Sequence, residues 1–290
     1  MNLKRHYQAI FIFILCLLPG WGIAKDRLNI SAQKEGIIDE QAGTITFKEK
    51  VLVERSSGGL LKTDLLNLFY NKLRKPDKAI ADGQVEFEKD GLIGSCGKAI
   101  VIKSQNTAEL FNLVHIRYYN SWIRAHNVKY NYQLGNGTIK GNLKNPVSFY
   151  YESIDPQTTK QNIVKGNANQ IYINQQKQEI IFQGAVFIEG VLSKSTLQTH
   201  HLLVNYNLNK EIDKAFANGA FKLKQENRVS TSDRAILDYS TEVITLIGNA
   251  RVETEKGILQ SPRIEMYMKS EKGLIKAEKD KPLKIEIELE

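Results

Sequence analysis

The sequence predicts an all-β protein made of stacked repeats that share one continuous core. Past Lys25, apolar residues recur at every second position along most of the chain, which is the pattern of half-buried strands. The strand segments also recur at long, fixed intervals, as in stacked supersecondary units. The composition is 42% hydrophobic and 25% charged, which excludes a mainly disordered chain, a collagen and a multi-span membrane protein.

The first element is a predicted secretory signal over residues 1–24. A basic start at Lys4–His6 precedes the unbroken apolar run Ala9–Leu18, and Pro19-Gly20 then interrupts it. Gly22-Ile23-Ala24 supplies small residues at the −3 and −1 positions of a cleavage site. The apolar run is about half of the roughly 20 residues that a spanning helix needs. We therefore expect a cleaved signal and an exported protein, with an uncleaved anchor as the alternative.

Cleavage of the signal would change the net charge and the number of cysteines in the mature chain. The formal net charge is +8, and cleavage after Ala24 would remove Lys4 and Arg5 but no acid, leaving +6. An excess of positive charge suits an anionic partner. Cleavage would also remove Cys16, so that Cys96 becomes the only thiol and no internal disulfide can form. We interpret Cys96 as a small packing residue, because nothing near it in sequence would lower the pKa of its thiol.

Five strand segments show the repeat. Ile180–Ile188 and Ile244–Val252 are the same unit at an offset of 64 residues, and Ile45–Val53 is a third copy. Ala79–Phe87 and Ala215–Leu223 match each other at an offset of 136 residues, each with small residues, a glycine and then large residues. Such long-range self-similarity predicts strands that stack on one another.

A glycine stands near the middle of each unit except the third copy. These are Gly83, Gly184, Gly219 and Gly248, and Glu49 takes the corresponding position at the start of the chain. Because glycine weakens a strand ladder, we predict that each marks a bulge or bend where the sheet curls over itself. Gly58-Gly59 and Gly135-Asn136-Gly137 are interpreted as hairpin turns.

The middle of the chain keeps strand-forming residues but loses the clean repeat. Asn145-Pro146 and Asp155-Pro156 predict turns or breaks there. We expect an N-terminal half over 25–160, with an irregular stretch at 105–160, and a C-terminal half over 161–290. No flexible linker is indicated by composition, so the two halves are expected to be continuous.

No catalytic, cofactor or metal site is predicted, and we expect that the chain is not an enzyme. The histidines past the signal are His115, His126, His200 and His201. Neighbouring residues of a strand point to opposite faces, so His200 and His201 cannot readily bind one metal ion. Acids are expected at strand ends or turns for reasons of solvation; these are Asp213, Asp233 and Asp238. A polysaccharide-active β-helix enzyme is the alternative that these acids leave open.

Arg117, Tyr118, Tyr119, Trp122 and Arg124 form a cluster of basic and aromatic residues, which nucleic-acid-binding surfaces also contain. The predicted export and the spread of lysines along the whole chain argue against that function. An anionic lipid head group could use the same charges.

The C-terminal unit resembles a known family. The segments that carry the resemblance are Asp233–Tyr239, Val243–Val252, Ile258–Gln260 and Ile264–Met268. They resemble the OstA-like repeat of lipopolysaccharide-transport proteins. Ile180–Leu208 and Ile45–Phe87 look like further copies, so that the resemblance covers most of 30–280.

This resemblance implies an elongated, V-shaped (taco-like) β-jellyroll of stacked antiparallel strands with an apolar groove. In Gram-negative outer membrane biogenesis, such a periplasmic protein holds the lipid A acyl chains of lipopolysaccharide and passes the lipid from the inner to the outer membrane. It also implies edge-to-edge strand pairing with other jellyroll proteins of the bridge and head-to-tail self-association. An inner-membrane-anchored partner of the same pathway and a structural β-solenoid without lipid are the alternatives.

The inward-facing apolar residues are the predicted lipid-binding groove. They are Ile45, Phe47, Val51, Val53, Val85, Phe87, Ile180, Phe182, Val186, Ile188, Phe221, Leu223, Ile244, Leu246 and Val252. At the C-terminus, Ile285–Glu290 alternates apolar and acidic residues, which predicts an edge strand able to pair with another jellyroll.

Overall fold

The computed structural model describes residues 27–56, 58–154, 161–191, 193–208, 211–268, 273–276 and 284–286. For the last two segments, and for residues 153, 154 and 162, only the backbone is described. The predicted signal at 1–24 and the last four residues of the chain lie outside this range. Over the described range the structure is all-β, and it contains no helix long and apolar enough to cross a membrane.

The chain divides into two compact units near residue 147. The N-terminal unit contains β1 (Leu28–Ser31), β2 (Glu35–Asp39), β3 (Thr44–Arg55), β4 (Leu60–Tyr70), β5 (Pro76–Lys89), β6 (Leu92–Ile102), β7 (Thr107–Tyr118), β8 (Ser121–Asn131) and β9 (Asn136–Lys140). The C-terminal unit contains β10 (Val147–Ile154), β11 (Gln161–Ala168), β12 (Gln170–Asn174), β13 (Glu179–Gly190), β14 (Ser195–Tyr206), β15 (Ile212–Gln225), β16 (Arg228–Asp238), β17 (Val243–Thr254), β18 (Gly257–Tyr267), β19 (Gly273–Lys276) and β20 (Lys284–Glu286).

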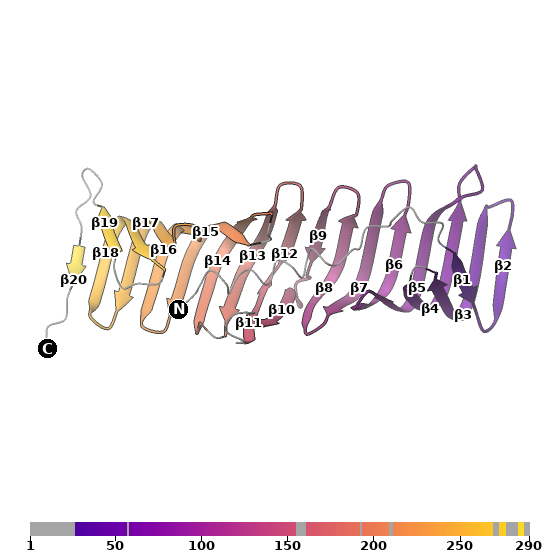
Figure 1. Ribbon diagram of the computed structural model, residues 1–290, viewed down its shortest axis with the longest axis horizontal. Coiled ribbons are helices and arrows are strands. Elements are labelled where there is room, and N and C mark those ends of the chain that lie inside the picture. Colours follow the sequence, from indigo (N-terminus) through magenta and orange to yellow (C-terminus); the bar gives the residue numbers. More distant parts are fainter. Residues whose placement is uncertain are drawn as a thin grey trace. The chain divides into compact units, whose positions relative to one another are not determined.

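Each unit is an antiparallel meander in which a strand pairs with the next one along the chain (Figure 1). At the start of the N-terminal unit, the short strands β1 and β2 pair with different parts of β3. Strands β11 and β12 pair in the same way with β13, and β19 and β20 with β18. The predicted stack of antiparallel strands is confirmed.

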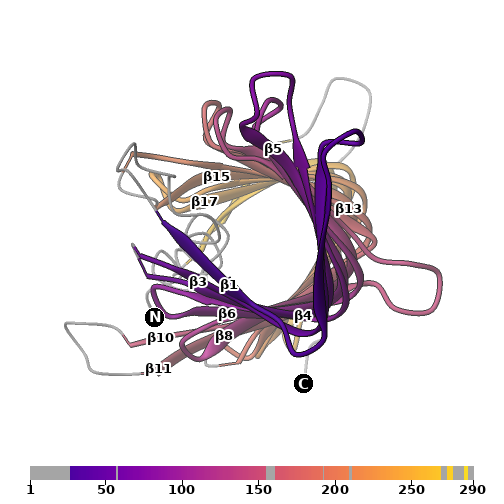
Figure 2. The ribbon, with the colours of Figure 1, turned by 90° about the vertical axis from the view of Figure 1, so that its right-hand side faces the viewer.

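The long strands bend near their middles, as Figure 2 shows. In β5, β13, β15 and β17 a β-bulge lies at the predicted glycine. The pairing register shifts there, for example between Gln183 and Val186 of β13. Gly184 has a φ of 73°, and Gly83, Gly219 and Gly248 also have positive φ values. In β3, Glu49 and Lys50 adopt the same left-handed conformation with φ values of 64° and 47°. The predicted bends are therefore confirmed, and the missing glycine at Glu49 does not abolish the bulge.

Glycine is needed at these four positions because a side chain of the preceding strand or bend lies against each of them. A Cβ added at Gly184 would lie 2.5 Å from Asn169 Nδ2, and one at Gly248 would lie 2.5 Å from Asp233 Oδ2. Left-handed backbone and close approach together therefore exclude a side chain.

Threonine hydroxyls hold the bulges of the two units in the same way. Thr63 donates a hydrogen bond to the carbonyl oxygens of Asp82 (2.9 Å) and Gly83 (3.2 Å). Thr199 donates to the corresponding carbonyls of Asn218 (3.1 Å) and Gly219 (3.0 Å). Each hydroxyl is buried and so satisfies carbonyl groups that the bulge removes from the ladder.

Strands β7 and β8 continue the pattern of their neighbours within the stretch 105–160. Their register shifts between Phe111 and Val114, where Asn112 and Leu113 have φ values of 64° and 56°. The bulge is thus present without glycine, because asparagine tolerates the left-handed region and Leu113 is exposed.

Candidate functional site

The inner face of the C-terminal unit is a set of apolar rows that cross the strands. In one row, Ile180 of β13 is followed across the sheet by Val204, Ala215, Leu237, Ile244 and Met266. A second row runs from Phe182 through Leu202, Ala217, Ala235, Leu246 and Ile264. Beyond the bulges, Ile188, Leu223 and Val252 share a third row. The structure therefore brings the predicted residues of different repeats side by side.

The N-terminal unit has equivalent rows. Phe47 pairs with Leu66, and Ile45 with Leu68. Val53 and Phe87 are joined through Leu61, which lies between them on β4. Rows of this kind follow from the period of two along each strand and from the fixed register between strands.

Exposure of the inner face differs between the two units. All nine predicted residues of the C-terminal unit are at most 8% exposed. In the N-terminal unit, Val51 and Val85 are buried, whereas Ile45, Phe47, Val53 and Phe87 keep part of their surface accessible. The N-terminal unit therefore offers apolar side chains that are not covered by the packing of the unit itself.

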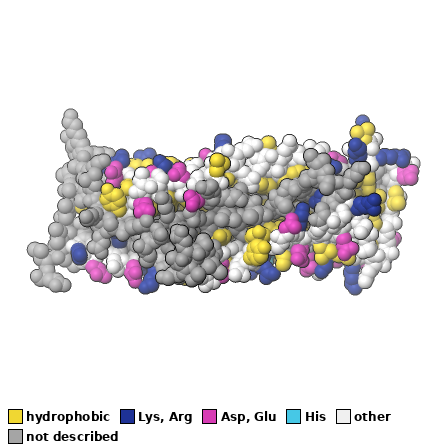
Figure 3. Space-filling model, in the orientation of Figure 1, with side chains coloured by type: hydrophobic (Ala, Val, Ile, Leu, Met, Phe, Trp, Pro, Cys, Tyr) yellow, Lys and Arg dark blue, Asp and Glu magenta, His cyan; other side chains and the backbone are white. Residues whose placement is uncertain are grey.

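The outer face carries charges in cross-strand pairs. Lys98 contacts Asp82 at 2.9 Å, Lys129 contacts Glu109 at 2.7 Å, and Lys214 contacts Asp238 at 3.1 Å. Figure 3 shows basic and acidic side chains interspersed over the described part of one face. Basic residues that pair with acids are poor candidates for a strong anion site, because their charge is already compensated.

Several residues that the sequence singled out have structural roles. Cys96 is buried, and burial raises the pKa of its thiol to about 11, in agreement with its interpretation as a packing residue. His200 lies against Gly219 at a bulge. No group of residues that could hold a metal ion occurs in the part of the chain that the structure describes.

The expected placement of the acids is correct for two of three. Asp213 lies at the start of β15, and Asp238 ends β16 and accepts hydrogen bonds from the turn that follows. The prediction for Asp233 was wrong, because it lies within β16. There it faces the bulge of β17 and accepts a hydrogen bond from Asn249 Nδ2 at 3.0 Å.

Sequence reasoning did not include in the predicted groove the inner-face residues of β4 and β14. They are Leu61, Leu66, Leu68, Leu202 and Val204, and the first is half-buried while the others are buried. The alternation of apolar residues within Leu60–Tyr70 and Ser195–Tyr206 was the signal that could have identified them.

A comparison with known protein families agrees with the sequence resemblance. Residues 158–272 match the family model described as LptA/(LptD N-terminal domain) LPS transport protein. No curated protein gave a match in sequence. Among solved structures, the chain is similar to the crystal structure of LptH, the LptA homologous periplasmic component of the lipopolysaccharide transport device from Pseudomonas aeruginosa. That similarity has 12% identity and a TM-score of 0.35, and it covers 40% of this chain and 83% of that chain.

The matched range contains both Ile180–Ile188 and Ile244–Val252, two of the segments in which the repeat was found. The family is one of transport proteins, which agrees with the prediction that the chain is not an enzyme. Residues 158–272 are thus similar to the family of lipopolysaccharide-transport proteins that the sequence resemblance implied.

Proposed function

We propose that the protein is a periplasmic carrier that holds the lipid A acyl chains of lipopolysaccharide and passes the lipid from the inner to the outer membrane. The observation that carries this proposal is the accessible apolar surface on the inner face of the N-terminal unit. The residues that carry this surface are half-buried; they are Ile45, Phe47, Val53 and Phe87. In the C-terminal unit, the predicted residues of the corresponding inner face are buried. The match of residues 158–272 to a model of lipopolysaccharide-transport proteins supports the choice of lipid.

Binding of this kind needs no catalytic residue. Each methylene that leaves water for an apolar surface contributes about 0.8 kcal/mol. Several acyl chains can therefore be held strongly by the rows of Ile, Val, Leu and Phe side chains.

The two units differ in what an acyl chain would meet. In the N-terminal unit, it would contact side chains that already have free surface. In the C-terminal unit, it would have to separate packed side chains such as Phe182 and Leu246, which are at most 2% exposed. We therefore place the stronger lipid contact on the N-terminal unit, with the C-terminal rows as a groove that opens only when lipid enters.

Edge-to-edge pairing with other jellyroll proteins of the bridge, and head-to-tail self-association, belong to the same proposal. At the start of the chain, β1 and β2 form their ladders with β3, and Leu28, Ile37 and Ile38 expose 43–69% of their surface. A short edge strand with exposed apolar residues is suited to strand addition. At the other end, deletion of 283–290 should weaken self-association or partner binding.

Lipopolysaccharide binding by the purified chain tests the carrier function. Phe47→Asn with Val53→Asn should weaken binding by about tenfold, because two polar groups would face the acyl chains. Leu52→Asn is the matched control, since Leu52 pairs with Lys62 on the opposite face of the same strand. Equal binding by both variants, with their circular dichroism spectra unchanged, would contradict the proposal. N-terminal sequencing of the exported chain separates a soluble carrier, starting at Lys25, from an anchored partner.

A further inference from the structure

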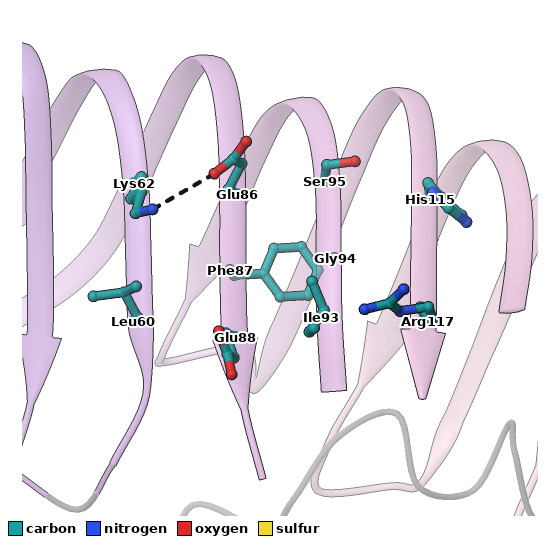
Figure 4. Close-up of a pocket in the computed structure, with 10 residues that line it drawn as sticks. All are labelled: Leu60, Lys62, Glu86, Phe87, Glu88, Ile93, Gly94, Ser95, His115 and Arg117. Atoms are coloured by element: carbon teal, nitrogen blue, oxygen red, sulfur yellow. Dashed lines mark ion pairs between the residues drawn. The ribbon is translucent and has the colours of Figure 1, made fainter. Parts of the chain in front are cut away.

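A pocket of about 360 Å³ opens in the N-terminal unit, and its lining includes Phe87 of the apolar rows and Gly94 beside it (Figure 4). Two parallel rows of side chains frame it, at neighbouring registers of β5, β6 and β7. One row is Glu86, Ser95 and His115, and the other is Glu88, Ile93 and Arg117.

The pocket has an acidic end and a basic end. Glu86 and Glu88 project from β5, and the Glu86 carboxylate is 3.9 Å from Lys62 on β4. Glu88 is exposed and forms no ion pair among the described residues, and the same holds for Arg117 on β7. One carboxylate and one guanidinium thus face the same pocket without neutralising each other.

Strand β8 reinforces the basic end. Arg124 stacks on the Trp122 ring with its Cζ atom 4.8 Å from the ring centroid, and the His115 ring packs against the same indole at 6.3 Å. Burial lowers the pKa of His115, and Arg124 and Arg117 lower it further. The positive electrostatic potential of Arg117 and Arg124 therefore extends to this end of the pocket. Stacking holds the guanidinium of Arg124 in a fixed orientation.

The middle of the pocket is wide and carries no charged side chain. Strand β6 contributes Ile93, Gly94 and Ser95, none of which is charged, and Ile93 is 39% exposed. Strands β5 and β7 are two strand spacings apart, which is about 10 Å. A ligand that satisfies both ends must carry a cation and an anion separated by a short, uncharged link that rests on Ile93.

We propose that this pocket binds a small zwitterion of the phosphoethanolamine class. The ammonium group pairs with Glu88, the phosphate pairs with Arg117, and the ethylene link contacts Ile93. Nucleic acid does not fit this site, because Glu86 and Glu88 would repel a continuous chain of phosphates. The charged side chains of the site lie on the face opposite to the lipid-carrying rows, although Phe87 also lines the pocket. The variants below leave Phe47 and Val53 unchanged, so their outcome is distinguishable from that of the proposed function.

Trp122 provides a direct readout. The chain has two tryptophans, Trp21 and Trp122, so a Trp21→Phe chain gives a single indole N–H resonance. Titration with O-phosphoethanolamine should shift that resonance in a saturable manner, and inorganic phosphate or ethanolamine alone should bind at least tenfold more weakly. Arg117→Gln and Glu88→Gln should each weaken binding by about tenfold, as expected for a charge-assisted hydrogen bond.

Glu54→Gln is the matched control, because Glu54 lies in the row of Glu88 but outside the pocket, beyond Leu60. Its affinity should equal that of the unmodified chain. Equal binding of inorganic phosphate and O-phosphoethanolamine would overturn the proposal, and so would an unchanged affinity of Glu88→Gln. Sedimentation with phosphatidylcholine vesicles, with and without phosphatidylethanolamine, then distinguishes a membrane head group from a soluble zwitterion.

Discussion

The ring of Phe87 lies across Gly94 on the neighbouring strand, and a Cβ added at Gly94 would collide with that ring. Gly94 has no positive φ, so the collision and not the backbone is what requires glycine here. The contact lies on the inner face of the N-terminal unit, where Phe87 is half-buried.

Gly94→Ala should therefore destabilise the protein by about 1–3 kcal/mol, as overpacking does. Phe87→Ala in the same chain should remove most of the additional cost. The check is a double-mutant cycle by urea denaturation, with a coupling free energy above about 1 kcal/mol. Strictly additive effects would show that the ring is free to move away from Gly94.

The bulge glycines should be sensitive to any side chain. Gly184→Ala should lower the free energy of unfolding by about 2–3 kcal/mol, because it combines a left-handed backbone with the approach of Asn169. Gly36→Ala is the control, since its added Cβ would meet Phe47 at an ordinary 3.6 Å and its φ is not positive. Thermal unfolding of both variants measures the difference, and equal stabilities would contradict this explanation of the glycines.

Asp238 should support stability at neutral pH but not in acid. Burial disfavours its charge, but hydrogen bonds from Ser240 and Thr241 and the ion pair with Lys214 outweigh burial. They hold the pKa of Asp238 well below its ordinary value of 3.8. The stabilisation is thus complete above pH 3.8 and is lost as the pH falls through the lower value.

Asp238→Asn should accordingly lower stability by about 1 kcal/mol at pH 7, where the carboxylate is charged. The difference from the unmodified chain should shrink in strong acid. Urea unfolding at pH 7 and at pH 2–3 measures it. A difference that stays constant with pH would mean that the charge of Asp238 contributes nothing.

His115 should make stability rise with pH. Its pKa is lowered from 6.5 by burial and by Arg124 and Arg117, and its Nε2 atom is buried without a hydrogen-bond partner in the described structure. The unfolded chain therefore binds a proton that the folded chain resists, so stability falls as the pH drops below 6.5.

Arg124→Gln should raise the pKa of His115, measured by the pH dependence of its imidazole NMR signals. Arg251→Gln, in the C-terminal unit, is the control and should leave it unchanged. No change in the Arg124→Gln chain would contradict the electrostatic part of this account.

The sequence was sufficient to predict the strand stack and the bends at Gly83, Gly184, Gly219 and Gly248, because alternation and strand glycines are local signals. The bulge at Asn112 and Leu113 was not predicted, since its residues have no distinctive chemistry. Asp233 was misplaced for a related reason. An acid that faces a bulge on the next strand looks in sequence like an acid in a turn.

The inner face was also predictable in part. Alternation identified Phe47 and Phe182 as equivalent, but not that Phe47 is half-buried while Phe182 is 2% exposed. That difference depends on how strands far apart in the sequence pack over each inner face. The pocket between Glu88 and Arg117 likewise depends on the register of three strands, although Arg117, Trp122 and Arg124 already stood out as a cluster.

The most direct test of the central proposal is photo-crosslinking of the full chain to lipopolysaccharide. A photoreactive amino acid is placed at Phe47, on the inner face of β3, or at Thr46, which hydrogen-bonds Asn67 on the outer face. A second pair, Phe182 and Gln183, examines the C-terminal unit in the same way. We predict strong labelling at Phe47, weaker labelling at Phe182 and none at Thr46 or Gln183; equal labelling at Phe47 and Thr46, or none at either, would contradict the lipid-carrying function.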